Sequence, residues 1–267
     1  MANNTQQFQG LWAIILGGSS GFGFASIEKL ARHGMNIAVL YRETAQIEKA
    51  LLPKFETIAK ENAVQILSYN INALDEAGRS KFIEAFSKLV PQKNCVRLLL
   101  HSIARGNLKP LYSLDESELS ADEIQLTTYA MSNSILDWTR LLLKENLFNN
   151  DARIIGLTSQ GAHAYWQGYA AVSIAKSSLE SLANYMAVEL AKYGLKTNLI
   201  QAGITETPSL KRIPGSEELI KYAQTMNPLG RSTQPRDVAN VIYLLCTDEA
   251  AWINGSLIHV DGGEHCR

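Results

Sequence analysis

Leu11-Trp-Ala-Ile-Ile-Leu16 leads without a break into Gly17-Gly-Ser-Ser-Gly-Phe-Gly23, and this succession carries the strongest structural signal in the chain. The first segment is almost wholly apolar, which is typical of a strand covered on both faces in a parallel sheet. After the glycines, Ile27, Leu30 and Ala31 recur at helical spacing. A strand, a glycine turn and a helix in this order are typical of the first crossover of a nucleotide-binding α/β domain.

The same alternation continues along the rest of the chain. Apolar runs predict further strands at Asn36–Tyr41, Val64–Ser68, Arg97–His101, Ala152–Thr158, Lys196–Gln201 and Ser256–Val260. Amphipathic stretches predict helices at Phe22–Arg32, Ala45–Lys60, Asp75–Leu89, Asp122–Asn146, Tyr169–Tyr193 and Pro235–Cys246. Repeated strand–helix–strand units form right-handed crossovers. The sequence therefore predicts an α/β fold with a doubly wound, Rossmann-type seven-stranded parallel sheet, in a single domain of residues 1–267.

The composition and charge of the chain argue against several classes of protein and several kinds of partner. Hydrophobic residues make up 46% of the 267 residues and charged residues 19%, which excludes a disordered chain. The 25 Lys and Arg residues balance 26 Asp and Glu residues, so no bulk charge favours nucleic acid. Three scattered cysteines indicate neither a disulfide framework nor a metal site. Because no apolar run approaches the ~20 residues of a membrane span and no signal-peptide pattern is present, we expect a cytoplasmic protein without a membrane partner.

The glycine turn predicts a cradle for a pyrophosphate group. Gly17 allows the tight turn, while Gly21 and Gly23 let backbone N–H groups approach the phosphates at the helix N-terminus. The two serines of the turn add hydroxyl donors. A tight turn without a ligand remains the alternative. The predicted cradle consists of Gly17, Ser19, Ser20, Gly21, Phe22 and Gly23.

The end of the second predicted strand bears on the choice between NADPH and NADH. NAD-dependent enzymes place an acidic residue there to bind the ribose hydroxyls. Here the strand ends in Tyr41 and Arg42, and a guanidinium group pairs well with a 2′-phosphate. We therefore favour NADPH over NADH. Two alternatives remain, because Glu43 could face the ribose and Arg42 could be a solvated loop charge.

Tyr169 and Lys176 are the candidate catalytic pair. Seven helical residues make nearly two turns, so both side chains lie on one helix face, separated by ~10 Å of rise. A cation close to a phenol favours the phenolate and is expected to lower the pKa of the tyrosine. The alternative is a half-buried tyrosine and a lysine that extends to solvent, with no joint role.

The glycine motif, the Tyr169…Lys176 pair and the segment Gly255-Ser-Leu-Ile-His-Val-Asp-Gly-Gly263 occur in the order found in the short-chain dehydrogenase/reductase superfamily. The chain resembles that superfamily over nearly its whole length. Ordinary members use Tyr-x3-Lys, which would require a tyrosine at position 172, where this chain has Val172. In this chain, six residues lie between Tyr169 and Lys176, and this arrangement resembles the divergent branch of enoyl-acyl carrier protein reductases.

Two further motifs support the resemblance to the enoyl-acyl carrier protein reductase branch. One position, Ser159, differs from the residue that many members of this branch carry. His101-Ser-Ile-Ala104 replaces the Asn-Asn-Ala-Gly of ordinary members, and Gly203-Ile-Thr-Glu-Thr207 resembles the loop that contacts nicotinamide and pyrophosphate. Many members of the branch carry a second tyrosine where this chain has Ser159. Ser159 and the retained glycines together resemble a smaller, NADPH-preferring subgroup.

The resemblance implies NADPH-dependent reduction of the double bond of a trans-2-enoyl thioester that is carried on an acyl carrier protein in fatty-acid synthesis. Tyr169 would stabilise the enolate, and Lys176 would hold the nicotinamide ribose. A homotetramer built on the helices at Asp122–Asn146 and Tyr169–Tyr193 is expected from resemblance alone. The other implied cofactor contacts are Asn70 and Ile71 at the adenine, Ser102, Ile103 and Ala104 along the ribose and nicotinamide, and Gly203, Ile204 and Thr207 at the carboxamide and phosphate.

The segment from Gly203 to Arg231 interrupts the alternation and is a candidate substrate lid. It contains a short helical stretch at Ser216–Met226, and its expected apolar lining is Leu210, Ile213, Leu219 and Met226. A wandering surface loop is the alternative. Tyr165 either lines the acyl site or packs loosely on its loop.

Two other functions remain open. The first is an ordinary carbonyl reductase of the same fold that acts on a 3-oxoacyl thioester, against which the missing Tyr-x3-Lys argues. The second is a non-catalytic NADPH-binding protein, against which the intact Tyr169/Lys176 pair argues.

Overall fold

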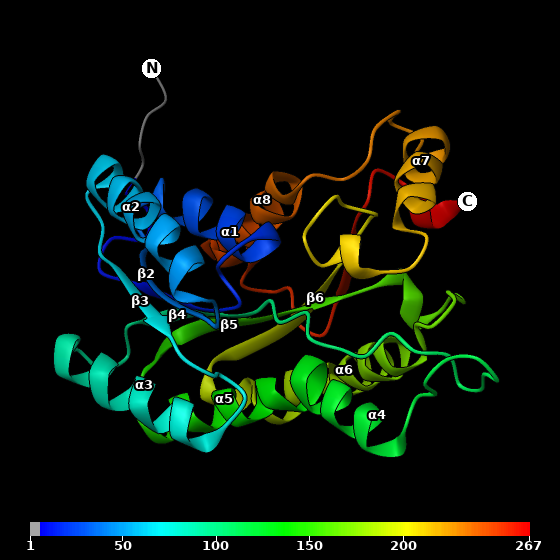
Figure 1. The fold of residues 1–267 in the computed structure, drawn as a ribbon. Coiled ribbons are helices and arrows are strands. Elements are labelled where there is room, and N and C mark those ends of the chain that lie inside the picture. The colour runs from blue at the N-terminus through cyan, green and yellow to red at the C-terminus, as the bar shows by residue number, and fades with distance from the viewer. Residues whose placement is uncertain (1–5) are drawn as a thin grey trace.

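A computed structural model describes residues 6–267, and its core is a seven-stranded parallel sheet between two layers of helices (Figure 1). The strands are β1 (Trp12–Leu16), β2 (Asn36–Tyr41), β3 (Ile66–Asn70), β4 (Val96–His101), β5 (Phe148–Thr158), β6 (Leu195–Ala202) and β7 (Leu257–Val260). Their order across the sheet is β3-β2-β1-β4-β5-β6-β7, with every pair parallel. The Rossmann-type fold predicted from the sequence is confirmed.

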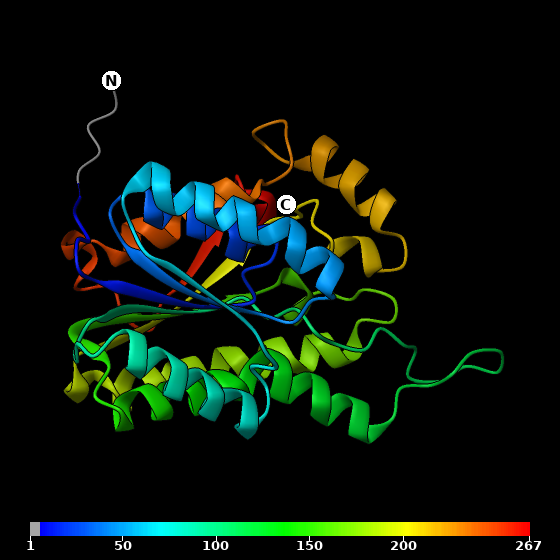
Figure 2. The same cartoon turned by 60° about the vertical axis from the view of Figure 1, so that its left-hand side comes forward.

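The helices divide between the two faces of the sheet, as the two views show (Figures 1 and 2). One face is covered by α1 (Gly21–Ala31), α2 (Ala45–Asn62) and α8 (Pro235–Cys246). The other is covered by α3 (Glu76–Leu89), α4 (Ala121–Thr128), α5 (Ser134–Lys144) and α6 (Ala170–Glu189). A further helix, α7 (Ser216–Met226), lies apart from both layers, beside the last residues of the chain.

The two faces of the central strand β1 pack into separate hydrophobic cores, which explains why this strand is apolar throughout. In β1, Ile14 and Leu16 belong to the core under α3 and α5, where Trp138 is fully buried. Ala13 and Ile15 belong to the core under α1, together with Ile27. Burial of each large apolar side chain contributes roughly 1.5–3 kcal/mol to folding, so both helical layers are held by the sheet.

The helix expected at Asp122–Asn146 is divided by a π-helical turn at Tyr129–Asn133. Next to this turn, the Ser134 hydroxyl donates to the carbonyl oxygen of Ala130 at 3.2 Å and lies 2.8 Å from Nε2 of the buried His101. Such turns form where a side chain competes for the backbone hydrogen bonds of a helix. This contact joins residues far apart in sequence, so helical periodicity alone did not predict the division.

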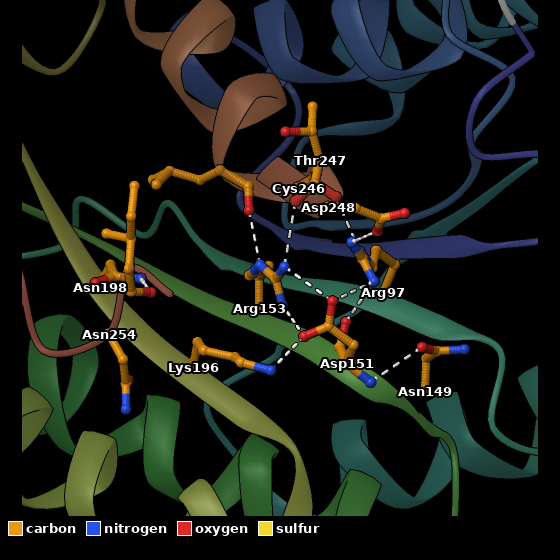
Figure 3. A network of polar contacts seen from close by, with 12 residues as sticks. Arg97, Asn149, Asp151, Arg153, Lys196, Asn198, Cys246, Thr247, Asp248 and Asn254 are labelled. Carbon is orange, nitrogen blue, oxygen red and sulfur yellow. Dashed lines mark hydrogen bonds and ion pairs between the residues drawn. The ribbon is translucent and has the colours of Figure 1, made fainter. Parts of the chain in front are cut away.

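At the amino-terminal end of β5, Asp151 joins a network of buried cations (Figure 3). Asp151 accepts from Arg97 at 2.9 Å and from Arg153 at 2.6 Å, and it also pairs with Lys196. Arg153 Nε donates to the carbonyl oxygen of Leu245 at 2.7 Å, and Arg97 Nε to that of Cys246 at 2.9 Å. These carbonyls end α8, so the network fixes this helix to the sheet, at the far end of β5 from Ser159.

The candidate lid contains a 3-10 turn at Leu210–Arg212 followed by α7, whose bounds match the predicted helical stretch. A single bridge between Thr205 and Thr233 ties the two ends of the segment together. No helix within residues 6–267 has both the length and the apolar character required to cross a membrane.

Candidate active site

A cavity of about 670 Å³ opens at the carboxyl ends of the strands, where ligands of doubly wound sheets bind. Several regions of the sequence meet there, among them the glycine loop after β1, the end of β2, the segments that follow β4 and β5, and the candidate lid. Both Tyr169 and Lys176 belong to its lining. The residues predicted from separate motifs therefore share one site.

The glycine loop is shaped by two close backbone approaches. Gly17 has a positive φ of 89°, and a Cβ atom there would lie 2.4 Å from the carbonyl oxygen of Ser102. A Cβ atom on Gly23 would lie 2.2 Å from the carbonyl oxygen of Gly17. Gly23 is absent from the cavity lining, so it lets α1 pack onto the loop and does not itself face a ligand.

The loop fits the pyrophosphate of a dinucleotide. Ser19, Ser20, Gly21 and Phe22 line the cavity where α1 begins. The first turn of α1 carries no acidic side chain, so its backbone N–H groups and helix dipole favour an anion. On the opposite wall, Thr207 of the candidate lid approaches the position of a Gly21 side chain at 3.5 Å. Gly21 also has a positive φ of 56°, which favours glycine on this side of the passage between α1 and Thr207.

At the end of β2, Arg42 and Glu43 both line the cavity, but their side chains are held differently. The Ser19 hydroxyl donates to Glu43 Oε1 at 2.8 Å. Arg42 is exposed and has no hydrogen-bond or ion-pair partner among the residues that the structure describes. The guanidinium group is therefore available to an anion, whereas the carboxylate is already engaged by the loop.

Asn70 lies outside the cavity lining, contrary to its expected place beside the adenine. Its amide group accepts from the Glu43 N–H and donates to the Glu43 carbonyl, both at 3.0 Å. In a third bond, the Asn70 amide donates to the Glu48 carboxylate at 2.9 Å. Asn70 thus shapes the loop that carries Arg42. Its neighbour Ile71 does line the cavity, as predicted.

Tyr169 occupies the N-cap of α6, and its hydroxyl donates to Ser159 Oγ at 3.4 Å. Burial raises the pKa of Tyr169, and the Ser159 hydrogen bond acts in the opposite direction. The sequence predicted that Lys176 would lower this pKa. That prediction is wrong, because the lysine is bound elsewhere and desolvation dominates at the phenol. Tyr169 is therefore a protonated donor at neutral pH.

Lys176 is buried, and its Nζ donates to the carbonyl oxygen of Leu157 at 2.7 Å. Burial lowers the pKa of Lys176 to about 8, and the nearby Glu180 carboxylate opposes this shift. Glu180 is itself fixed by the Thr158 hydroxyl at 2.6 Å and by His163 Nε2 at 2.8 Å. The ammonium group is thus held in a defined position, one helical turn from a carboxylate.

Most of the remaining predicted residues meet at the cavity, and two do not. Tyr165 is 86% exposed and lies outside the lining, whereas the adjacent Trp166 belongs to it. Met226 also lies outside the lining. The predicted residues that do line the cavity in these regions are Ser102, Ile103, Ala104, Gly203, Ile204, Thr207, Leu210, Ile213 and Leu219.

The sequence did not identify Glu264 as a site residue. It is buried, lines the cavity, and accepts a hydrogen bond from the Ile204 N–H at 3.1 Å. A usable signal was present, since Glu264 follows two glycines directly after the last strand. Residues at the carboxyl ends of parallel strands face the ligand site of this fold.

Comparisons with known proteins are consistent with this geometry. The family model described as Enoyl-(Acyl carrier protein) reductase matches residues 17–265. The FabI enoyl-[acyl-carrier-protein] reductase [NADH] of Aquifex aeolicus is 29% identical over 236 residues, which cover 88% of this chain and 83% of that protein. A crystal structure of the Aquifex aeolicus enoyl reductase (NADH) superimposes with a TM-score of 0.82 at 25% identity, covering 98% of both chains. A tropinone reductase homolog of Arabidopsis thaliana is 25% identical over 255 residues, which cover 96% of this chain and 91% of that protein.

Proposed function

Because this chain belongs to the enoyl-(acyl carrier protein) reductase family, within the short-chain dehydrogenase/reductase superfamily, we propose that it reduces the double bond of trans-2-enoyl thioesters with NADPH. Members of the superfamily are oxidoreductases that use a nicotinamide cofactor. The observation that carries the finer proposal is the placement of Tyr169 and Lys176 in one cavity at a spacing of seven residues, with Val172 between them.

The cavity residues suit the binding of a dinucleotide. Ser19, Ser20 and Gly21 would bind the pyrophosphate with the N–H groups of α1, and Thr207 would close the passage over it. The Lys176 ammonium group would bind the ribose hydroxyls. When bound, the cofactor supplies a hydride, and the chain's own residues provide orientation and electrostatics.

Tyr169 stabilises the charge that develops during the reduction. As the β-carbon of the thioester is reduced, negative charge moves onto the thioester oxygen. The protonated Tyr169 hydroxyl donates a hydrogen bond to that oxygen, and the low-polarity site strengthens the bond. Lys176 keeps its proton below about pH 8 and adds a positive field. Apolar residues of the lid, Leu210 and Leu219, would cover the acyl chain.

The proposed preference for NADPH rests on Arg42. Its exposed guanidinium group lines the cavity without a protein partner among residues 6–267 and suits a 2′-phosphate. The Aquifex relative is named for NADH, so the preference needs its own test. We expect Arg42→Ala to weaken NADPH binding by roughly tenfold and to leave NADH binding almost unchanged. Equal losses for both cofactors would contradict this role.

A second candidate function is reduction of a carbonyl group. Ser159 and Tyr169 place two hydroxyl groups 3.4 Å apart in the cavity, and such a pair would also suit a ketone oxygen. The tropinone reductase homologs among the relatives favour keeping this candidate. Position 172, where ordinary members need a tyrosine, is Val172 and argues against it.

One experiment separates these functions. Purified protein is supplied with crotonyl or acetoacetyl thioesters, on coenzyme A and on an acyl carrier protein, and loss of NADPH or NADH absorbance is followed. We expect rapid oxidation of NADPH by the crotonyl thioester. Faster oxidation by the acetoacetyl thioester would support the carbonyl reductase. Cofactor binding without turnover of either substrate would indicate a non-catalytic protein.

We further propose that the substrate is carried on an acyl carrier protein during fatty-acid synthesis in the cytoplasm, and that the enzyme is a homotetramer. The assembly is supported by exposed apolar side chains on the two helices expected at its interfaces: Leu126 on α4, and Tyr185 and Val188 on α6. Light scattering that gives the mass of a single chain would refute the tetramer.

A further inference from the structure

Glu264 is directed into the cavity by the turn that follows β7. Gly262 and Gly263 both adopt positive φ angles, of 64° and 87°. The Asp261 carboxylate accepts the N–H of Gly263 at 2.9 Å and that of His265 at 3.0 Å. These two bonds fix the turn from both sides of Glu264. The hydrogen-bonded turn therefore fixes the backbone at Glu264 and, with it, the direction of the Glu264 side chain.

The two carboxyl oxygens of Glu264 have different surroundings. Only 6% of the residue is exposed, and it lines the cavity beside Gly203 and Ile204. Oε1 accepts from the Ile204 N–H at 3.1 Å. Oε2 is also buried, yet it has no hydrogen-bond partner among residues 6–267. Buried polar atoms almost always have a hydrogen-bond partner. We therefore expect a bound molecule to supply a donor to Glu264 Oε2.

A primary amide matches the arrangement at this point of the cavity. Such a group has a carbonyl oxygen that accepts and an NH₂ group that donates. The Ile204 N–H is a donor, and the Glu264 carboxyl group is an acceptor next to it. Burial raises the pKa of Glu264 and the hydrogen bond from the Ile204 N–H acts in the opposite direction, but an acceptor oxygen remains in either protonation state. An acyl chain has no donor to offer here.

We propose that Glu264 is a further cofactor-binding residue, whose carboxyl group accepts a hydrogen bond from the NH₂ of the nicotinamide carboxamide. The Ile204 N–H then donates to the oxygen of the same amide, in exchange for its present bond to Glu264. This inference rests on the proposed function, because it requires a nicotinamide cofactor in the cavity. It adds an acidic side chain to the residues that the resemblance implies at the carboxamide and phosphate.

The test compares two ligands that differ only in the donor. NADP⁺ carries the amide, and its 3-acetylpyridine analogue replaces NH₂ by methyl while keeping the carbonyl oxygen. Equilibrium affinities are measured by titration calorimetry for the native protein, Glu264→Ala and Glu264→Leu. We expect the native protein to bind the amide roughly tenfold more tightly than the analogue. In both variants, the ratio of the two affinities should fall close to one.

The ratio separates the hydrogen bond from the general effect of removing a negative charge, since both ligands experience that effect equally. Glu264→Gln keeps an acceptor oxygen and should retain most of the preference. Glu56→Ala removes an exposed carboxylate on the outside of α2 and should keep the native ratio. Circular dichroism checks that each variant is folded, and the leucine variant preserves side-chain bulk if the alanine variant unfolds.

Each outcome bears on the inference. Equal ratios in the native protein and in the folded leucine variant would overturn the role of Glu264 while leaving the proposed function intact. If neither dinucleotide binds the native protein, the proposed function and this inference fail together. If NAD⁺ binds more tightly than NADP⁺, the same comparison is made with NAD⁺ and its acetylpyridine analogue.

Discussion

Replacement of Asp151 by asparagine is expected to destabilise the fold without touching the candidate active site. Asp151 is the shared partner of three cations: Arg97, Arg153 and Lys196. The Arg153 side chain is 1% exposed and that of Arg97 is 5% exposed. The variant Asp151→Asn keeps the shape of the residue but leaves two buried guanidinium groups without this carboxylate.

The size of the expected loss in stability depends on the hydrogen-bond partners that Arg97 and Arg153 keep in the variant. Removal of one partner from a buried ion pair costs about 3–5 kcal/mol, because the other charge is left uncompensated. Here the carbonyl oxygens of Leu245 and Cys246 still accept from Arg153 and Arg97. We therefore expect a loss near the lower end, about 3 kcal/mol in the free energy of unfolding.

Urea unfolding at a fixed protein concentration measures this loss, with Asp248→Asn as the matched control. Asp248 also pairs with Arg97, at 2.7 Å, but its side chain is 91% exposed. Exposed pairs contribute about 0–1 kcal/mol, so the control should unfold almost like the native protein. If Asp151→Asn is no more destabilising than Asp248→Asn, the argument from buried charge is refuted.

The same carboxylate predicts how stability depends on pH. Burial acts to raise the pKa of Asp151, but the hydrogen bonds from Arg153 and Lys196 prevail and hold it well below its usual range. Its stabilisation is therefore complete above the unfolded-state pKa of about 3.9 and is lost as the pH falls toward the folded-state value. Acid should thus destabilise the native protein more steeply than Asp151→Asn.

Three further predictions concern the site and the thiols. Tyr169→Phe should lower kcat by roughly 10²–10³-fold with little change in cofactor affinity, as measured by turnover and by calorimetry, and near-native turnover would contradict the assigned donor. Because the pKa of Lys176 is about 8, its ammonium form is lost as the pH rises through that value, so kcat/KM should decline there; a flat profile to higher pH would contradict this role. Cys95 and Cys246 are buried and Cys266 is exposed, so a disulfide reagent should titrate a single thiol in the native protein and all three after denaturation. Reaction of more than one native thiol would show that a buried cysteine is accessible.

Most of the fold could be predicted because its signals are local. The alternation of apolar runs with helical periodicity located all seven strands, and β1 with its glycine turn identified the nucleotide end of the sheet. The placement of Tyr169 and Lys176 on one site could also be predicted, because helical geometry relates two residues seven apart. Ile71 was expected at the cofactor site by resemblance, Arg42 by its place at the end of the second strand and Leu210 as a residue of the candidate lid, and all three line the cavity.

The rest depends on contacts between segments that are distant in sequence. The π-helical turn lies next to the contact of Ser134 with His101, and the bonds of Asn70 shape the loop at Glu43. Trp166 lines the cavity, whereas its neighbour Tyr165 is exposed. The raised pKa of Tyr169 follows from burial by several segments at once, which no spacing encodes.

The amino-acid sequence by itself determined the order of strands and helices, the glycine turn and the candidate pair of Tyr169 and Lys176, since periodicity and short-range spacing specify these directly. Only the tertiary structure decided which side chains line the cavity, where Glu264 and Ile204 meet, and how Asp151 compensates two buried arginines. Burial, hydrogen-bond partners and pKa values depend on the complete set of neighbours, and those neighbours are assembled only when the sheet and its two helical layers pack together.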